Sequence, residues 1–200
     1  MPEFDYTPYW YQRVSTFKEL AGRTYSRPII AMLGDSLTEG FPFDEFFPQY
    51  SFANRGISGD VTKAALDRLN ESILSIHPDR VGILLGTNDL AFGYSDDEIL
   101  AAMQEILHRI RTQVPSAVVA VQSVLPTRDD PTRPNPRIRE LNRELEPLTR
   151  SFGCAWIDLH PAFADPTGQL SPAFSLDGLH LNGPGYRRWA ELLDPWLTQP

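Results

Sequence analysis

Five short apolar segments alternate along this chain with longer segments of helical periodicity, and this alternation constrains the fold more than any other feature. An apolar run of about four to eight residues between helical patterns is typical of a strand that is buried on both faces. Strands and helices in alternation favour a parallel sheet with helices on both sides. We therefore predict an α/β fold, a three-layer α/β/α sandwich with a five-stranded parallel sheet. The predicted strands span residues 29–33, 51–54, 81–85, 117–124 and 155–159.

The helical segments carry start signals and apolar stripes. Residues 60–74 open on Asp60 as a predicted N-cap, and residues 95–114 open on Ser95 with Glu98 three positions later, the pattern of a capping box. An apolar stripe at helical spacing is more often core than a binding groove, and we predict a core role for Ile99, Met103, Ile106, Leu107 and Ile110. Two further helices are predicted over residues 135–152 and 183–197.

The chain of 200 residues fits one domain, with a core over 28–200 and a helical extension over 1–27. The extension contains an aromatic-rich stretch that we expect to form a helix on the outside of the domain. Its aromatic side chains either cover a contact between subunits of a homo-oligomer or pack on their own domain. These side chains are Tyr6, Tyr9, Trp10 and Tyr11.

Composition and charge argue against several classes of partner and site. A net charge of −8 and a pI near 5.0 argue against nucleic acid or an anionic membrane as the main partner. No segment approaches the roughly 18 apolar residues of a membrane span, and no signal peptide is visible, so a cytoplasmic location is expected, with a processed secreted form as the alternative. The single cysteine, Cys154, allows no intrachain disulfide, and no metal-binding motif is present.

Chemically capable residues follow the predicted strands, where the loops of a parallel sheet gather. Gly34-Asp35-Ser36 follows the first strand, and Gly56 to Asp60 follows the second. Gly86-Thr87-Asn88-Asp89 follows the third, and Asp177 and His180 lie three residues apart beyond the last. The four loops together present a hydroxyl, a glycine-rich turn, an amide and an acid–base pair.

Acyl transfer needs these parts. A serine hydroxyl becomes a good nucleophile when an imidazole takes its proton and a carboxylate orients that imidazole. The developing oxyanion needs donors already in place, such as backbone N–H groups or an amide side chain. Ser36 supplies a hydroxyl and an N–H, Gly59 an approachable backbone, and Asn88 a neutral NH₂ group. Asp177 and His180 are close enough in sequence for the carboxylate to reach Nδ1.

The four segments, Gly34-Asp35-Ser36-Leu37, the block ending at Gly59, Gly86-Thr87-Asn88-Asp89 and Asp177-Gly178-Leu179-His180, resemble the signature blocks of the SGNH (GDSL-type) hydrolases. The resemblance implies a flavodoxin-like fold and esterase or acylhydrolase activity without a cofactor. It also implies roles by position: Ser36 as nucleophile, Asp177 and His180 as its triad partners, and Ser36, Gly59 and Asn88 as the oxyanion hole. The segments NRGISGD and VLPTRDDPTRPNPRIRELN resemble the branch with the platelet-activating-factor acetylhydrolase catalytic subunits.

The predicted function is therefore hydrolysis of small carboxylic esters with short acyl groups, acetyl first, through an acyl-serine intermediate. The same machinery serves a thioesterase or lysophospholipase, and a non-catalytic carbohydrate- or lipid-binding module on the same fold is the alternative from a different class.

Several residues have competing interpretations. Ser36 by itself is a good helix cap, and Asn88 by itself suits a turn. Asp158 and His160 also follow a strand and form an alternative acid–base pair, whereas Asp35 and Asp89 are expected to be structural. Further alternatives are that Arg55 reaches over the site toward the leaving group, and that four phenylalanines narrow the acyl pocket rather than filling the core. The four phenylalanines are Phe41, Phe43, Phe46 and Phe47.

Overall fold

The computed structural model describes residues 4–23, 25–26 and 28–198. The sheet is five-stranded and entirely parallel, in the order β2-β1-β3-β4-β5. This confirms the predicted α/β fold and its parallel sheet, with strand bounds that differ from the predicted ones by at most two residues. The strands are β1 (Ile29–Gly34), β2 (Ser51–Gly56), β3 (Arg80–Leu84), β4 (Val118–Gln122) and β5 (Ala155–Ile157).

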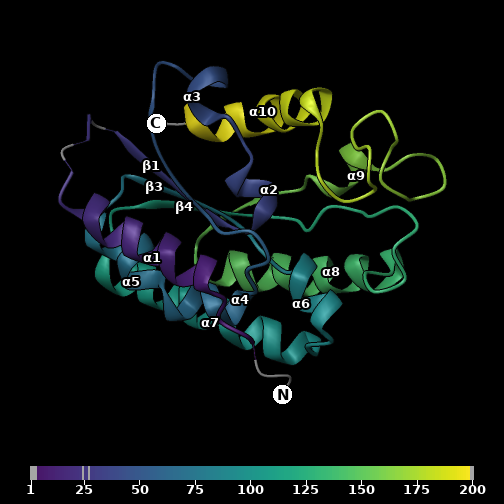
Figure 1. Ribbon diagram of the computed structural model, residues 1–200, viewed down its shortest axis with the longest axis horizontal. Coiled ribbons are helices and arrows are strands. Elements are labelled where there is room, and N and C mark those ends of the chain that lie inside the picture. The colour runs from purple at the N-terminus through teal and green to yellow at the C-terminus, as the bar shows by residue number, and fades with distance from the viewer. Residues whose placement is uncertain (1–3, 24, 27, 199–200) are drawn as a thin grey trace.

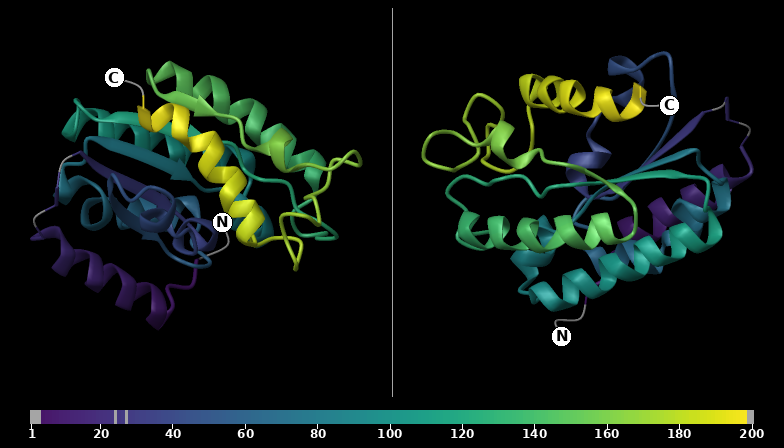
Figure 2. Two further views of the ribbon diagram at one scale, coloured as in Figure 1. Left: turned by 90° about the horizontal axis from the view of Figure 1, so that it is seen from above. Right: turned by 180° about the vertical axis from the view of Figure 1, so that it is seen from behind.

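Helices cover both faces of the sheet, so that the layers run helix, sheet, helix (Figure 1). One layer contains α1 (Pro8–Ala21), α4 (Thr62–Asp67), α5 (Leu69–Ser72), α6 (Thr87–Phe92), α7 (Asp96–Gln113) and α8 (Asn135–Ser151). The opposite layer contains α3 (Phe43–Phe46), α9 (His160–Phe163) and α10 (Gly183–Thr198). Figure 2 shows from two further directions that α8 and α10 lie on opposite sides of the strands.

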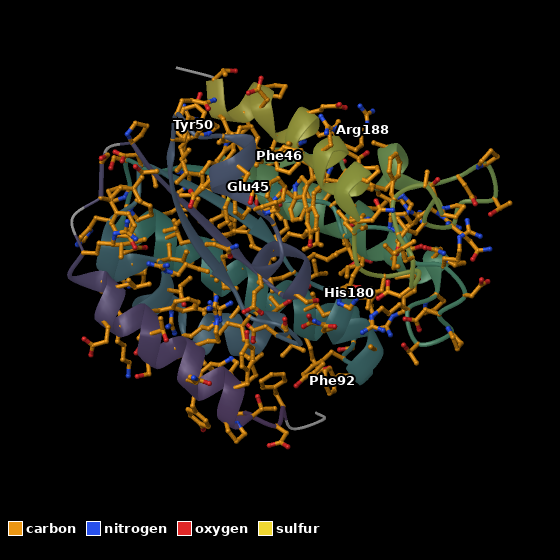
Figure 3. All side chains as sticks on the ribbon, turned by 45° about the horizontal axis from the view of Figure 1, so that its top comes forward. Glu45, Phe46, Tyr50, Phe92, His180 and Arg188 are labelled. Atoms are coloured by element: carbon orange, nitrogen blue, oxygen red, sulfur yellow. The ribbon has the colours of Figure 1, made fainter. Side chains whose placement is uncertain are left out.

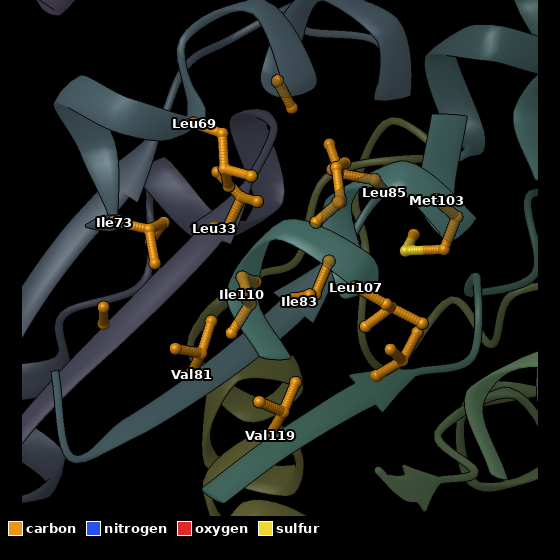
Figure 4. Close-up of a cluster of buried hydrophobic side chains, with 14 of the residues drawn as sticks. Leu33, Leu69, Ile73, Val81, Ile83, Leu85, Met103, Leu107, Ile110 and Val119 are labelled. Atoms are coloured by element: carbon orange, nitrogen blue, oxygen red, sulfur yellow. The ribbon is translucent and has the colours of Figure 1, made fainter. Parts of the chain in front are cut away.

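Strand β1 is apolar throughout because both of its faces are buried. In β1, Ala31 and Leu33 contact one hydrophobic cluster while Ile30 and Met32 contact the other, and all four are fully buried. Successive residues of a strand point to opposite faces, which explains the division. Figure 4 shows the first cluster between the sheet and α7, where the predicted stripe of α7 is buried as expected.

The second cluster lies under α10. The indole of Trp189 is fully buried there and donates its Nε1–H to Oε1 of Gln122 on β4, at 2.6 Å. A buried indole needs such a partner, and this one attaches α10 to the centre of the sheet. Phe41, Phe43 and Phe47 belong to the same cluster, so these side chains fill the core rather than an acyl pocket.

The segment over residues 60–74 is not the single helix that its periodicity predicts. Its first helix begins at Thr62, and Arg68 separates α4 from α5. Asp60 does not cap this helix, because its carboxylate binds the buried Arg68 (2.7 Å) and Trp10 (3.1 Å) instead. A buried ion pair therefore takes precedence over the local helix signal. By contrast, the capping box of Ser95 and Glu98 is present as predicted.

The predicted outside helix is α1, although residues 1–3, 24 and 27 of the predicted extension lie outside the described residues, as do residues 199 and 200. In the described ranges no helix is long and apolar enough to cross a membrane.

Candidate active site

Ser36 lies where β1 ends and the short helix α2 (Ser36–Glu39) begins. Asp35 is the N-cap residue, and its Oδ1 accepts a hydrogen bond from the backbone N–H of Leu37 at 2.9 Å. Asp35 is buried, so the cap is sheltered from water. The sharp change from strand to helix places the Ser36 hydroxyl at the carboxyl edge of the sheet, and Asp35 has the structural role expected from sequence.

Asp177 and His180 come from the loop that precedes α10. The distance from His180 Nδ1 to Asp177 Oδ2 is 2.7 Å, and the distance from His180 Nε2 to Ser36 Oγ is 3.1 Å. Residues 144 positions apart in sequence are thereby connected in one line of hydrogen bonds. In the view of Figure 3, His180 lies between the two helical layers, below Phe46 and Arg188 of the upper layer.

The Asp177 carboxylate is held by more than the imidazole. Its Oδ1 accepts from the backbone N–H groups of Leu179 (2.9 Å) and His180 (2.8 Å) and from the hydroxyl of Ser175 (3.2 Å). Partial burial acts to raise the pKa of Asp177, but the hydrogen bonds from His180 and the two N–H groups outweigh it and hold the pKa well below its usual range. The carboxylate is therefore ionised at every pH at which the protein would be used.

The site is open to solvent. The side chain of His180 is 49% exposed and that of Asp177 is 57% exposed. Phe92, at the end of α6, is also half exposed. An imidazole in this setting is accessible to a substrate without movement of any covering segment.

Gly59 lies in the loop after β2, and Asn88 lies in the first turn of α6, after β3. Gly59 has φ +81°, a left-handed conformation that favours glycine, and a Cβ placed there would meet no atom within 4 Å. The residue is thus required by the turn and leaves open space beside the backbone. Asn88 is buried, and its Nδ2 donates to the backbone carbonyl of Asp60 at 3.0 Å.

Arg133, in the loop after β4, fixes the orientation of the Asn88 amide. One of its terminal nitrogens donates to Asn88 Oδ1 at 3.0 Å, and its Nε donates to the carbonyl of Thr87 at 3.0 Å. Since Arg133 can only donate, it selects the amide orientation in which oxygen faces the guanidinium. The Asn88 NH₂ group is thereby directed toward Asp60. Sequence reasoning did not identify this contact, which joins residues 45 positions apart.

Asp35 and Asp89 are buried carboxyl groups beneath the site. Burial raises the pKa of each to about 7, against the opposing effect of hydrogen bonds from Leu37 N–H to Asp35 and from Thr62 N–H to Asp89. Asp89 Oδ1 and Oδ2 accept from Thr62 N–H at 3.0 and 3.1 Å, which connects α6 to the start of α4. Both residues thus have the structural roles expected from sequence.

Replacing Asp35 by asparagine should change how stability depends on pH. The folded protein holds the Asp35 proton up to about pH 7, whereas the unfolded chain releases it near pH 4, so the free energy of unfolding falls as pH rises through this window. Asparagine still accepts from Leu37 N–H and has no proton to lose. We expect Asp35→Asn to gain up to about 4 kcal/mol over the wild type between pH 4 and pH 8.

Urea unfolding followed by tryptophan fluorescence at each pH measures this difference. Glu105→Gln is a suitable control, because Glu105 is an exposed residue of α7 paired with Arg109. A difference between Asp35→Asn and wild type that does not change from pH 4 to pH 8 would contradict the assignment.

Arg55 does not reach over the site, and that hypothesis is wrong. The side chain is buried and donates to the carbonyl of Ser72 (3.1 Å) and the hydroxyl of Tyr25 (2.8 Å), with its guanidinium 4.9 Å from the ring centroid of Phe17. Arg55 follows Ala53 at a spacing of two on β2, and alternate strand residues share a face. Ala53 lies in the cluster beneath α1, so Arg55 points into that layer.

Asp158 and His160 are not brought to Ser36. They line a separate cavity of about 280 Å³ between α8 and the end of β5, and His160 Nε2 has no hydrogen-bond partner within the described part of the chain. Burial lowers the pKa of His160, which therefore stays neutral. No group of three or more potential metal ligands occurs among the residues that the structure describes.

Comparison with known proteins gives the same family. The model of the GDSL-like lipase/acylhydrolase family matches residues 32–188. The platelet-activating factor acetylhydrolase IB subunit alpha2 of Gallus gallus is 28% identical over 182 residues, covering 86% of this chain and 77% of that protein. The Homo sapiens subunit is 26% identical over 178 residues, with the same coverage.

Solved structures agree with the sequence comparison. A GDSL-like lipase from Bacteroides thetaiotaomicron superposes with a TM-score of 0.81 at 25% identity, covering 94% of this chain and 96% of that one. The resemblance in the four sequence blocks is thus confirmed, together with hydrolysis of esters as the general activity of the family. With a matching model over most of its length, the chain belongs to the GDSL-like lipase/acylhydrolase family.

Proposed function

We propose that this protein is a serine esterase that hydrolyses small carboxylic esters with short acyl groups, acetyl first, through an acyl-serine intermediate. The observation that supports this most is the line of hydrogen bonds Ser36–His180–Asp177, with distances of 3.1 and 2.7 Å. The hydroxyl, imidazole and carboxylate stand in the order that general-base activation of a serine requires.

In the proposed reaction, Ser36 Oγ attacks the ester carbonyl carbon while His180 Nε2 takes the hydroxyl proton. The Asp177 carboxylate accepts from Nδ1–H, which keeps the lone pair of Nε2 directed at Ser36 and stabilises the imidazolium as it forms. The tetrahedral intermediate collapses when the alkoxide leaves with the proton from Nε2. Water then attacks the acyl-serine in the same way, giving the carboxylic acid and the free hydroxyl.

The negative oxygen of the tetrahedral intermediate needs donors, and we assign them to the N–H groups of Ser36 and Gly59 and to the side chain of Asn88. Asn88 Nδ2 has two N–H bonds, one of which is used on the carbonyl of Asp60. The second is offered to the oxyanion. Arg133 supports this assignment because it prevents the amide from turning its oxygen toward the substrate.

Two observations favour a short acyl group. Three of the phenylalanines that follow the nucleophile, Phe41, Phe43 and Phe47, are buried in the core under α10 rather than lining an acyl site. The similar relatives from Gallus gallus and Homo sapiens are acetylhydrolase subunits by name.

A series of p-nitrophenyl esters from acetate to decanoate tests the acyl preference. We expect kcat/KM to be highest for acetate or propionate and to fall by about tenfold or more toward octanoate, because an acyl site sized for acetyl excludes additional methylenes. An increase with chain length would overturn the short-acyl assignment in favour of a lysophospholipase. Failure of a fluorophosphonate probe to add covalently to Ser36 would favour the binding module.

A further inference from the structure

Glu39 lies one helical turn after Ser36 and binds the turn that carries Gly59. Its Oε2 accepts from the backbone N–H of Ser58 at 2.7 Å and from the Ser58 hydroxyl at 2.6 Å. Ser58 immediately precedes Gly59, so the peptide group that contains the Gly59 N–H joins Ser58 to Gly59. Glu39 therefore holds the residue at one end of this peptide group. The carboxylate therefore connects the helix of the nucleophile to the second proposed oxyanion donor.

The other carboxylate oxygen of Glu39 is bound by the N-terminal helix α1. The hydroxyl of Tyr9 donates to Oε1, and the guanidinium of Arg13 forms an ion pair with the same oxygen at 3.1 Å. Burial acts to raise the pKa of Glu39, but the hydrogen bonds from Ser58 and Tyr9 and the charge of Arg13 outweigh it, so the pKa is lowered. Glu39 is thus a carboxylate, and its contacts are strengthened by charge.

A second contact from α1 reaches the other side of the same turn. The buried indole of Trp10 donates to Asp60 Oδ1 at 3.1 Å, and the carbonyl of Asp60 accepts from Asn88 Nδ2 at 3.0 Å. Asp60 immediately follows Gly59. Gly59 therefore lies between two residues that are connected to α1. Ser58 is connected through Glu39, and Asp60 is bound directly by Trp10.

The packing beneath this turn leaves little room for adjustment. Arg13 also donates to the carbonyl of Gly56 at 3.1 Å, at the end of β2. A Cβ on Gly56 would lie 2.2 Å from the backbone nitrogen of Glu39, which shows how closely α2 approaches the strand. Figure 1 shows that α1 runs along this side of the sheet, with its N-terminal end toward the loops of the site.

We propose that Glu39 is a positioning residue for the oxyanion hole, and that it acts together with Tyr9, Arg13 and Trp10 of α1. The N-terminal helix, which contains no residue of the proposed triad, would set the direction of the Gly59 N–H and of the Asn88 amide. This proposal rests on the proposed function, because it assumes that Gly59 and Asn88 stabilise the oxyanion.

Removing the Glu39 side chain should affect turnover more than substrate binding. In Glu39→Ala the Ser58 N–H loses its acceptor, and α1 loses its attachment to α2 at this point. We expect kcat for p-nitrophenyl acetate to fall about 10- to 100-fold, less than the loss of a whole oxyanion donor, while KM stays within about twofold. The second-order rate of labelling by a fluorophosphonate should fall in parallel, since phosphonylation uses the same oxyanion donors.

Two further variants separate positioning from general stability. Glu39→Gln keeps a carbonyl oxygen for the Ser58 N–H, and we expect it to recover most of the lost kcat. Lys18→Ala is the matched control, because Lys18 attaches the same helix to Glu71 by an exposed ion pair of 3.7 Å on the other end of α1. It should leave kcat unchanged.

The outcomes distinguish this proposal from the proposed function. Wild type that shows no turnover dependent on Ser36 would overturn the proposed function itself. If wild type is active and Ser36-dependent, but Glu39→Ala retains its kcat, the positioning role is wrong and the esterase assignment stands. Equal losses in Glu39→Ala and Lys18→Ala would assign the effect to attachment of α1 in general and would also contradict the role of Glu39.

Discussion

Replacing Ser36 by alanine is expected to lower kcat for p-nitrophenyl acetate by about 10³-fold or more. The substitution removes the only atom that the proposed mechanism bonds to the acyl group, while the oxyanion donors and His180 remain. Any residual rate would come from direct attack by water with His180 as its base. Because Ser36 is the first residue of α2 and Asp35 supplies the cap, the variant should fold normally. Steady-state kinetics on purified protein measure the effect.

The control for this substitution is Ser151→Ala. Ser151 is an exposed residue at the end of α8 whose hydroxyl donates to the carbonyl of Leu148, far from any proposed site residue in sequence. It should retain full activity. Retention of wild-type kcat by Ser36→Ala would exclude the acyl-serine mechanism, whatever the geometry around His180.

Replacing Asp177 by asparagine is expected to lower kcat by about 10³- to 10⁴-fold, because the amide would select the wrong tautomer of His180. Oδ1 of Asp177 accepts from two backbone N–H groups, so the amide oxygen of the variant stays on that side. Its NH₂ group then takes the place of Oδ2, which in the wild type lies 2.7 Å from Nδ1 of His180. The imidazole must accept at Nδ1 and carry its proton on Nε2, where it cannot take the proton of Ser36.

Kinetics of Asp177→Asn beside Asp129→Asn test this expectation. Asp129 is exposed and has φ +54°, a conformation that asparagine tolerates well, so this control removes one negative charge without strain. It should leave kcat within about twofold. If Asp177→Asn were as active as Asp129→Asn, the Asp177 carboxylate would not orient the His180 imidazole, and Nδ1 of His180 would need another hydrogen-bond partner.

The fold and the proposed triad could be predicted from the sequence because both depend on local sequence patterns. The apolar runs set the strands, and Ser36, Asn88 and His180 stand in short motifs at loops after strands. The contacts of Arg133 and Glu39 were missed for a physical reason. Each contact joins residues that are distant along the chain, Arg133 with Asn88 and Glu39 with Tyr9. No local sequence pattern predicts such a pairing.

Arg55 and Arg68 are residues whose structural roles were predicted wrongly from the local sequence. Arg55 was considered as a residue that reaches over the site, yet it shares a strand face with Ala53, and this spacing was the available signal for burial. Arg68 interrupts a helical pattern that looked continuous, because its side chain turns inward to the carboxylate of Asp60. Burial of an arginine requires several acceptors at once, and these are supplied by tertiary structure rather than by neighbours in sequence.

The exposed position of His180 also bears on product release. In the proposed mechanism, His180 has half of its side-chain surface in water and gives its proton to an alcohol that can diffuse away directly, so departure of the first product should require no opening motion. The proposed enzyme would therefore place few steric limits on the alcohol half of its substrate, because that half departs on the exposed side of His180.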